Sequence, residues 1–317
     1  MFFNPETMTQ FIPEGEPPRE LVPEPARALA AGLVERPPLY RSYLWASALL
    51  NVGFQSAIPV PPRFAHASAG FVPLNAPIPI GPIPSQNFVG FGLYVLAEGN
   101  EGGQTIDILR LAGRLFPVVI TYGEIKLHGS PPNPYNAAST CWVRNRGTYR
   151  PWKQGILTCR HALRTLPMGS NVALVPSVHH STPLSSTLAD MDACTIDAAI
   201  LEIQPSDWPA GLTRRSVARP SAPGQTVQFE GRAGSSHSGH ILRVFNYNTY
   251  IGNLFGQRVI ADCHSVPGDS GSFLEDSSTN EAVGIYMGTI PDGKGGHDGI
   301  FQDLAQVESF FQVEIHY

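Results

Sequence analysis

The chain has 317 residues, a net charge of −5 and a pI near 6.0. Its length suits one large or two medium domains with a core of ordinary size. The lack of a basic excess argues against nucleic acid as the main partner. The abundance of glycine and proline argues against a helical bundle and favours turns and short strands.

Residues 1–87 differ in composition from the rest, since more than half of the prolines lie there. Between the proline runs, residues 25–35 and 40–50 are predicted as short helices, the first with proline near both ends. Residues 58–84 are expected to be extended and partly polyproline II. We interpret residues 1–87 as an N-terminal extension that wraps the main domain or binds a regulatory partner. A partly disordered arm is an equally weighted alternative.

We expect a soluble, cytoplasmic protein with no membrane partner. The first twenty residues lack a basic segment followed by an apolar run. The most apolar stretch, residues 39–60, is interrupted by polar residues and proline and is a poor candidate for a membrane span.

Residues 88–317 are predicted to form an all-β domain. Aromatic and β-branched residues in 87–99 and 115–129 predict strands. From residue 137 onward, short apolar segments alternate with turn residues, as in a β-barrel or sandwich. These segments are 139–145, 155–163, 171–178, 198–203, 226–232, 239–245, 258–263, 271–275, 282–288 and 299–304. One helix is expected at 304–311.

The cysteines favour free thiols. Cys141, Cys159, Cys194 and Cys263 form no CxxC pair, which argues against a zinc cluster. Without a signal peptide, reduced thiols are the default expectation. A Cys141–Cys159 disulfide is the alternative.

The segment VPGDSGSF, residues 266–273, has the composition of a nucleophile loop. A serine hydroxyl needs a base and backbone donors for the oxyanion. Gly268 and Gly271 allow a tight turn around Ser270, so that the N–H groups of Gly268 and Ser270 could converge as an oxyanion hole. A plain turn between strands is the alternative for this segment alone.

Two further residues lie at strand ends and complete a candidate triad. His161 follows the apolar strand GILT, and Asp197 directly precedes the apolar strand AAILEI. A histidine in such a place can act as a general base, and a partly buried carboxylate needs a specific hydrogen-bond donor. The alternative for His161 alone is a surface histidine or a hydrogen-bonded histidine in the core. The alternative for Asp197 alone is an aspartate in a turn at a strand end. The order His, Asp, Ser is that of chymotrypsin-type enzymes, and no GxSxG elbow is present.

These segments resemble motifs of the trypsin-like, chymotrypsin-fold serine peptidases. LTCRHAL resembles the family's histidine motif, DAAIL its aspartate motif and GDSGSF its serine motif. AVGIYMG resembles the strand that lines the substrate cleft, and residues 224–241 and 299–311 resemble segments of bacterial and plant intracellular members. The resemblance covers about residues 120–317. It implies two six-stranded antiparallel β-barrels with the triad between them.

The resemblance also implies a substrate pocket formed by His264, Tyr286, Met287 and Gly288. His264 stands six residues before Ser270, where the family has the residue at the base of the primary pocket. An imidazole there would disfavour Arg or Lys before the scissile bond and favour Gln, Glu or Asp. A loop of different length would move His264 out of the pocket, which is the alternative.

The sequence therefore predicts a serine endopeptidase that acts on protein or peptide substrates without a metal or cofactor. A regulated or dedicated intracellular processing protease is the preferred form. The alternative is a catalytically silent protease-fold binding module, its cleft blocked by the N-terminal extension. The zymogen junction of secreted members, whose new amine pairs with the aspartate at the position of Asp269, is missing.

Overall fold

The computed structural model describes residues 12–55, 64–73, 89–100, 103–127, 138, 141–174, 183–191, 196–218, 222–231, 236–244, 250–251, 254–255, 258–266, 268–293 and 295–317. Its helices are α2 (Glu24–Ala30), α3 (Pro37–Gln55) and α4 (Leu304–Phe311), with the 3₁₀ helices η2 (Arg19–Leu21), η3 (Ala31–Leu33), η4 (Arg160–Ala162) and η5 (Pro205–Asp207). Its first strands are β1 (Phe64–Pro73), β2 (Val89–Ala97), β3 (Gln104–Leu111), β4 (Arg114–Tyr122), β5 (Lys126–Leu127), β6 (Cys141–Asn145), β7 (Gln154–Thr158), β8 (Asn171–Leu174), β9 (Leu184–Met191) and β10 (Ala199–Ile203). The later strands are β11 (Thr226–Glu230), β12 (Ser236–Val244), β13 (Tyr250–Ile251), β14 (Leu254–Phe255), β15 (Arg258–Ala261), β16 (Phe273–Asp276), β17 (Ala282–Pro291), β18 (His297–Asp303) and β19 (Val313–His316).

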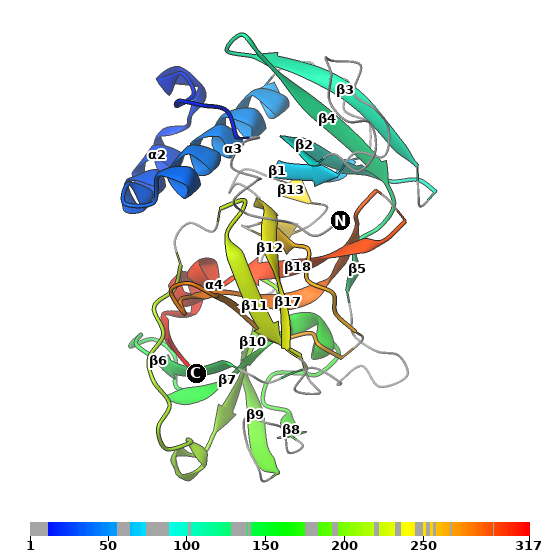
Figure 1. Ribbon diagram of the computed structural model, residues 1–317. Helices are drawn as coiled ribbons and strands as arrows, with labels where there is room; N and C mark the ends of the chain where they lie inside the picture. The colour runs from blue at the N-terminus through cyan, green and yellow to red at the C-terminus, as the bar shows by residue number, and fades with distance from the viewer. Residues whose placement is uncertain are drawn as a thin grey trace.

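Six strands close into a β-barrel at the centre of the molecule (Figure 1). They are paired in the order β11-β16-β17-β18-β15-β12, and β12 returns to β11. In β11 the residues Val227 and Phe229 are buried and their neighbours are half-exposed, which is the alternation expected of a strand with one face in a core. The helix predicted at 304–311 follows the barrel as α4.

A second unit is a six-stranded antiparallel sheet with the order β19-β6-β7-β10-β9-β8. Its outer strand β19 is the last strand of the chain and pairs with β6. The predicted all-β fold is thus confirmed. The two six-stranded units are observed as one closed barrel and one six-stranded sheet.

The N-terminal part adds a sheet and a helical layer to the barrel. β1 pairs with β12 and β2, and the sheet continues to β4 and β3. Figure 1 shows α2 and α3 on one face of this sheet. In β2, Leu93 and Val95 belong to the core under the helices, whereas Tyr94 and Leu96 belong to the core shared with the barrel. The sheet is therefore buried on both faces at β2, whereas the outer strand β3 is partly exposed.

The structure can be compared with the predictions for residues 1–87 in part. The predicted helices are found as α2 with η3 and as α3, which is longer than predicted. Within the stretch predicted as extended, residues 64–73 form the strand β1, and the remainder lies outside the described residues. Position 87 falls between the paired strands β1 and β2, and the division of the chain there remains a prediction.

A buried ion pair joins the N-terminal sheet to the barrel. Arg243 of β12 donates to Asp298 of β18 at 2.8 Å and to the carbonyl oxygen of Phe71 at 3.3 Å. Its guanidinium lies 4.2 Å from the ring centroid of Tyr94, and the Tyr94 hydroxyl donates to the Pro291 carbonyl oxygen at 2.6 Å. A buried charge needs such partners, so these contacts fix β1 and β2 against the barrel.

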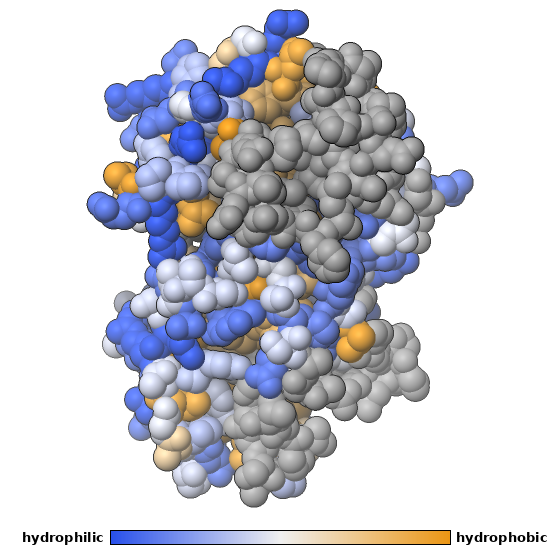
Figure 2. Space-filling view, viewed as in Figure 1, coloured by the Kyte–Doolittle hydropathy of each residue, from blue (hydrophilic) through white to orange (hydrophobic). Residues whose placement is uncertain are grey.

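Among the described residues, none of the helices is long and apolar enough to cross a membrane. Figure 2 shows a largely hydrophilic face with small, scattered apolar areas over the described residues. In the described part of the chain, the exposed large apolar side chains are Val34, Leu115, Leu127, Tyr149, Met168, Val266 and Phe310.

The packing of α3 gives the first testable prediction. Leu49 is fully buried in the core between the helices and the sheet, so Leu49→Ala should lower the free energy of unfolding by about 2–5 kcal/mol. Urea denaturation followed by circular dichroism measures this. Val34→Ala, at a residue that is 57% exposed, is the control and should change little. Equal unfolding midpoints for both variants and the wild type would mean that α3 does not belong to the cooperative fold.

Candidate active site

Strand pairing brings His161 and Asp197 together. His161 lies in η4, directly after β7, and Asp197 lies two residues before β10. β7 and β10 are antiparallel neighbours, and Thr158 pairs with Ala199. The end of one strand and the start of the other therefore meet at the same edge of the sheet.

The three predicted triad residues form a continuous hydrogen-bonded chain. The His161 Nδ1 atom lies 2.6 Å from Asp197 Oδ2, and the His161 backbone N–H donates to Asp197 Oδ1 at 2.8 Å. On the other side of the ring, His161 Nε2 lies 3.0 Å from Ser270 Oγ. Because a carboxylate can only accept, Nδ1 carries the proton, and Nε2 is left to accept the hydroxyl proton of Ser270.

Asp197 is held by groups from both β units. It is 5% exposed, and its backbone N–H donates to the Gln302 side chain of β18 at 3.2 Å. Burial alone would raise the pKa of the Asp197 carboxyl, but the hydrogen bonds and charge of His161, with the charge of Arg258, outweigh it and hold the pKa below its usual value. Asp197 is therefore ionised at neutral pH.

Arg258 is a site residue that the sequence did not single out. It is 1% exposed at the start of β15. Burial lowers the pKa of Arg258 to about 10, and the charges of Asp197 and Asp303 act in the opposite direction. The guanidinium therefore remains positively charged at neutral pH and compensates the buried carboxylates.

The serine loop adopts the tight turn expected from its glycines. Gly268 has φ +104° and Gly271 has φ +91°, both in the region that favours glycine. A Cβ on Gly271 would lie 2.4 Å from the carbonyl oxygen of Ala138, so no side chain fits there. The Asp269 carboxylate accepts the Val266 backbone N–H at 2.8 Å within the same loop. The oxyanion hole of Gly268 and Ser270 remains a prediction.

Ser270 is fully buried and has a second acceptor. Its hydroxyl lies 3.3 Å from the Met287 carbonyl oxygen in β17. Tyr286, Met287 and Gly288, predicted for the substrate pocket, are consecutive in that strand and therefore lie next to Ser270. His264 is exposed, in the segment between β15 and the serine loop, and its place in the pocket remains a prediction.

The Tyr286 side chain packs inside the closed barrel. Its ring is stacked on Phe229 at 5.9 Å and meets Phe301 edge to face at 5.3 Å. The Ser265 hydroxyl contacts the Tyr286 hydroxyl. Sequence reasoning missed Phe229, Phe301 and Ser265, because only the barrel closure brings their strands together.

Three of the four cysteines lie among the residues that the structure describes. Cys141, Cys159 and Cys263 are free and buried, so the alternative Cys141–Cys159 disulfide is absent, while Cys194 lies outside the described residues. Burial raises the pKa of all three thiols. The Cys159 thiol donates to the Tyr286 carbonyl oxygen at 2.8 Å.

Cys159, His161 and Asp197 are also the described residues with donor atoms close enough to share a metal ion, within 4.8 Å of one another. The thiol is bonded to a carbonyl oxygen, and the imidazole Nδ1 to the carboxylate. A metal would have to break the hydrogen bonds of the triad, so this arrangement favours proton transfer over metal binding.

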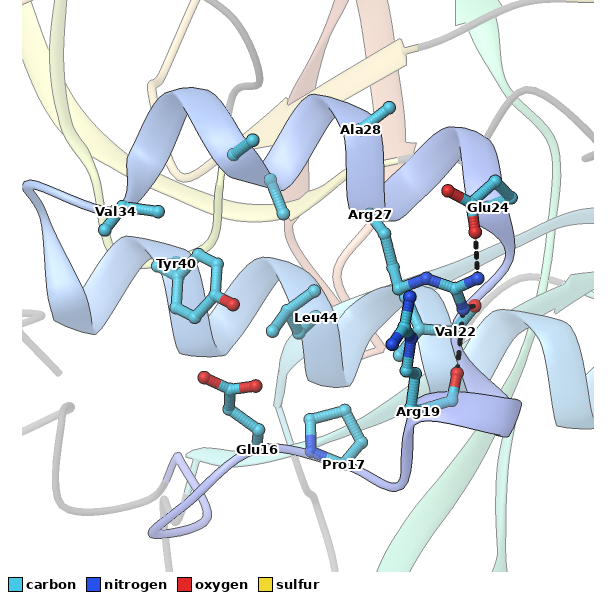
Figure 3. A pocket seen from close by; sticks show the side chains of 12 residues that line it. Glu16, Pro17, Arg19, Val22, Glu24, Arg27, Ala28, Val34, Tyr40 and Leu44 are labelled. Atoms are coloured by element: carbon cyan, nitrogen blue, oxygen red, sulfur yellow. Dashed lines mark hydrogen bonds and ion pairs between the residues drawn. The ribbon is translucent and has the colours of Figure 1, made fainter.

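A separate pocket of about 410 Å³ lies against the helices α2 and α3. Figure 3 shows Glu16, Arg19, Arg27 and Tyr40 at its border. The Arg27 guanidinium donates to the Arg19 carbonyl oxygen at 2.8 Å and contacts the Glu24 carboxylate. The Arg27 side chain is thus already hydrogen-bonded within the protein, and no triad residue lines the pocket. It is not the candidate active site.

Comparison with known proteins finds distant structural similarities. No family model and no curated protein sequence matches the chain. Thermobifida fusca Protease A is 18% identical with a TM-score of 0.40, over 56% of this chain and 90% of that one. Nocardiopsis protease is 16% identical with a TM-score of 0.41, over 56% and 92%. The HtrA-type protease AlgW with a decapeptide is 14% identical with a TM-score of 0.40, over 79% and 64%. At these values the similarities carry no conclusion about function, which depends on the geometry of the site.

The lowered pKa of Asp197 gives the second prediction. A carboxyl group with a lowered pKa in the folded state stabilises the fold above its unfolded pKa of about 4, and that contribution is lost as the pH falls through the folded pKa. The unfolding free energy should therefore fall more steeply between about pH 5 and pH 2 in the wild type than in Asp197→Asn. Urea titrations across this range measure the slopes.

Asp207→Asn, at a half-exposed aspartate in η5, is the matched control and should retain the wild-type slope. If Asp197→Asn retains it as well, Asp197 is not the buried, ionised partner of His161.

Proposed function

We propose that the chain is a serine endopeptidase of the trypsin-like kind. The observation that supports this is the chain of hydrogen bonds from Asp197 through His161 to Ser270, at 2.6 Å and 3.0 Å. Nucleophile and base lie within hydrogen-bond reach, and a third group orients the base, as nucleophilic catalysis requires. The order of the three residues in the chain and their positions at strand ends agree with this function.

The proposed reaction is acyl transfer in two halves. His161 Nε2 takes the proton of the Ser270 hydroxyl while Oγ attacks the carbonyl carbon of the scissile peptide bond. The backbone N–H groups of Gly268 and Ser270 hold the oxyanion. The protonated imidazole then gives its proton to the leaving amine, and the carbon–nitrogen bond breaks. Water, activated by His161, hydrolyses the acyl-enzyme and restores the serine.

Asp197 acts through His161 in this mechanism. Its ionised carboxylate fixes the tautomer with the proton on Nδ1 and stabilises the imidazolium that forms during attack. The hydrogen bonds and charge of His161, and to a smaller extent the charge of the buried Arg258, keep the carboxylate ionised. The proposed chemistry uses protein side chains and backbone and needs neither a metal nor a cofactor.

The proposed substrates are proteins or peptides, and the proposed location is a reducing, intracellular compartment. The strand β17, which carries Met287 next to Ser270, is ten residues long, which suffices to bind an extended peptide through its backbone. The three described cysteines are free and buried, which agrees with a compartment that keeps thiols reduced. A regulatory partner for residues 1–87 remains part of this proposal.

The second candidate function is a catalytically silent binding module. It is favoured by one observation, the complete burial of Ser270. It is disfavoured by the geometry of all three triad residues, since binding alone does not need a base aligned on a serine hydroxyl.

The third prediction separates these two functions. Ser270→Ala should lower the rate of peptide hydrolysis by about 10⁴- to 10⁶-fold, because the nucleophile is lost. Hydrolysis of a mixed peptide library and labelling by a fluorophosphonate measure this. Ser272→Ala is the matched control, since Ser272 is also buried and its hydroxyl has no hydrogen-bond partner among the described residues. Equal labelling of wild type and Ser270→Ala would refute the assignment.

The fourth prediction concerns the selectivity proposed for His264. A pocket without a carboxylate does not compensate the desolvation of Arg or Lys, whereas an imidazole can donate to Gln, Glu or Asp. Cleavage of the library should therefore occur after Gln, Glu or Asp, and His264→Ala should lower this preference by about tenfold, roughly the effect of losing one hydrogen bond. Sequencing of the cleaved peptides gives the result. Cleavage mainly after Arg or Lys, or a preference that His264→Ala leaves unchanged, would eliminate His264 as the selector.

A further inference from the structure

The edge of β17 beside Ser270 is occupied by another part of the chain. On one side of β17, Gly288 and Thr289 pair with β18. On the other side, β16 pairs with β17 only as far as Ile285, and the place beyond it is taken by β5, in which Leu127 pairs with Gly288 and Lys126 with Thr289. Figure 1 shows β5 beside the barrel, below the end of β4.

This edge begins at the candidate nucleophile. The Met287 carbonyl oxygen lies 3.3 Å from Ser270 Oγ, and the next residue in the strand, Gly288, is already paired with Leu127. An extended peptide recognised by strand addition needs a free row of backbone donors and acceptors. In the part of β17 closest to Ser270, the backbone is already paired with β5.

From this we propose that β5 occupies the peptide-binding edge of β17 and competes in cis with the substrate. The inference rests on the proposed function, which it extends to the regulation of the same site. The occupant is the segment Lys126–Leu127 of this chain, and the molecule that displaces it is an extended peptide.

The close approach of the two backbones leaves no room for a substrate between them. A Cβ on Gly288 would lie 2.1 Å from the Lys126 carbonyl oxygen and 2.8 Å from Leu127 Cα. A peptide can therefore pair with β17 at this position only after β5 has moved away. The complete burial of Ser270 agrees with a closed state of the site.

The same contacts indicate that β5 is displaceable. In the part of the chain that the structure describes, β5 comprises Lys126 and Leu127, and both side chains are exposed. Ile125, the preceding residue, packs against the core and is partly buried. A peptide that pairs over more residues, and also fills a side-chain pocket, gains more contacts than β5 loses.

The test compares a probe that needs the edge of β17 with one that does not. Replacing both residues of β5 with proline, Lys126→Pro with Leu127→Pro, removes the backbone N–H groups, whereas the matched double alanine variant keeps them. An alkyl fluorophosphonate reports whether Ser270 is reactive. A series of peptidyl phosphonates with Gln, Glu, Phe or Lys at the reacting position reports whether the edge is free.

We expect the ratio of peptidyl to alkyl labelling rates to rise about tenfold in the double proline variant, which is the effect of losing one or two backbone hydrogen bonds. The double alanine variant should keep the wild-type ratio. For peptide hydrolysis, the proline variant should lower KM by a similar factor and leave kcat unchanged, because a competitor in cis reduces only the fraction of free sites. Circular dichroism and the urea midpoint check folding, and the single variant Leu127→Pro replaces the double one if that does not fold.

Two failures are distinguishable. If the alkyl probe labels the wild type and the folded proline variant shows an unchanged ratio and KM, the competition by β5 is refuted while the proposed function stands. If the alkyl probe labels none of the folded proteins, the proposed function is refuted, and the inference about β5 falls with it.

Discussion

The buried carboxylate of Asp197 is the constraint that organises the site. An ionised carboxylate out of water is costly unless charge and hydrogen bonds compensate it. His161 supplies two hydrogen bonds, one from its ring and one from its backbone. Gln302 and Arg258 belong to the closed barrel, whereas Asp197 and His161 belong to the six-stranded sheet. The charge of Arg258 thus adds to the compensation of Asp197 from the side of the barrel. Gln302 accepts the Asp197 backbone N–H and links the two β units at the site, and Ser270 lies where they meet.

A second buried charge, Arg243, also joins two parts of the protein, farther from the site. Arg243 and Asp298 pair inside the protein at 2.8 Å, and the contacts of Arg243 with Phe71 and Tyr94 bring in the N-terminal sheet. The last strand of that sheet, β4, is followed after three residues by β5. The Arg243–Asp298 pair thus adds to the pairing of β1 with β12 in fixing the N-terminal sheet to the barrel, and the chain that leaves the sheet reaches the edge of β17 beside Ser270.

The sequence predicted the parts of the site that depend on local chemistry. Gly268 and Gly271 indicated a tight turn around Ser270, and the apolar strands before His161 and after Asp197 placed both at strand ends. Arg258 and Gln302 were not predicted, because nothing near them in the sequence indicates that β15 and β18 approach Asp197. β19 was missed for a similar reason, since its partner β6 lies far away in the chain. Residues 115–129 were predicted as one strand or a strand pair, and they contain most of β4 and all of β5. The pairing of β5 with β17 was not predicted, because it depends on the finished barrel.

The serine loop is stabilised by a hydrogen bond of the Asp269 side chain within the loop itself. In secreted members of the family that the sequence resembles, a new N-terminal amine pairs with the aspartate at the position of Asp269. Here Asp269 is 1% exposed and its carboxylate accepts the Val266 backbone N–H from its own loop. The loop geometry therefore does not require an external amine. Control by competition at the edge of β17 fits this arrangement, because a displaced strand exposes a site whose triad is already aligned.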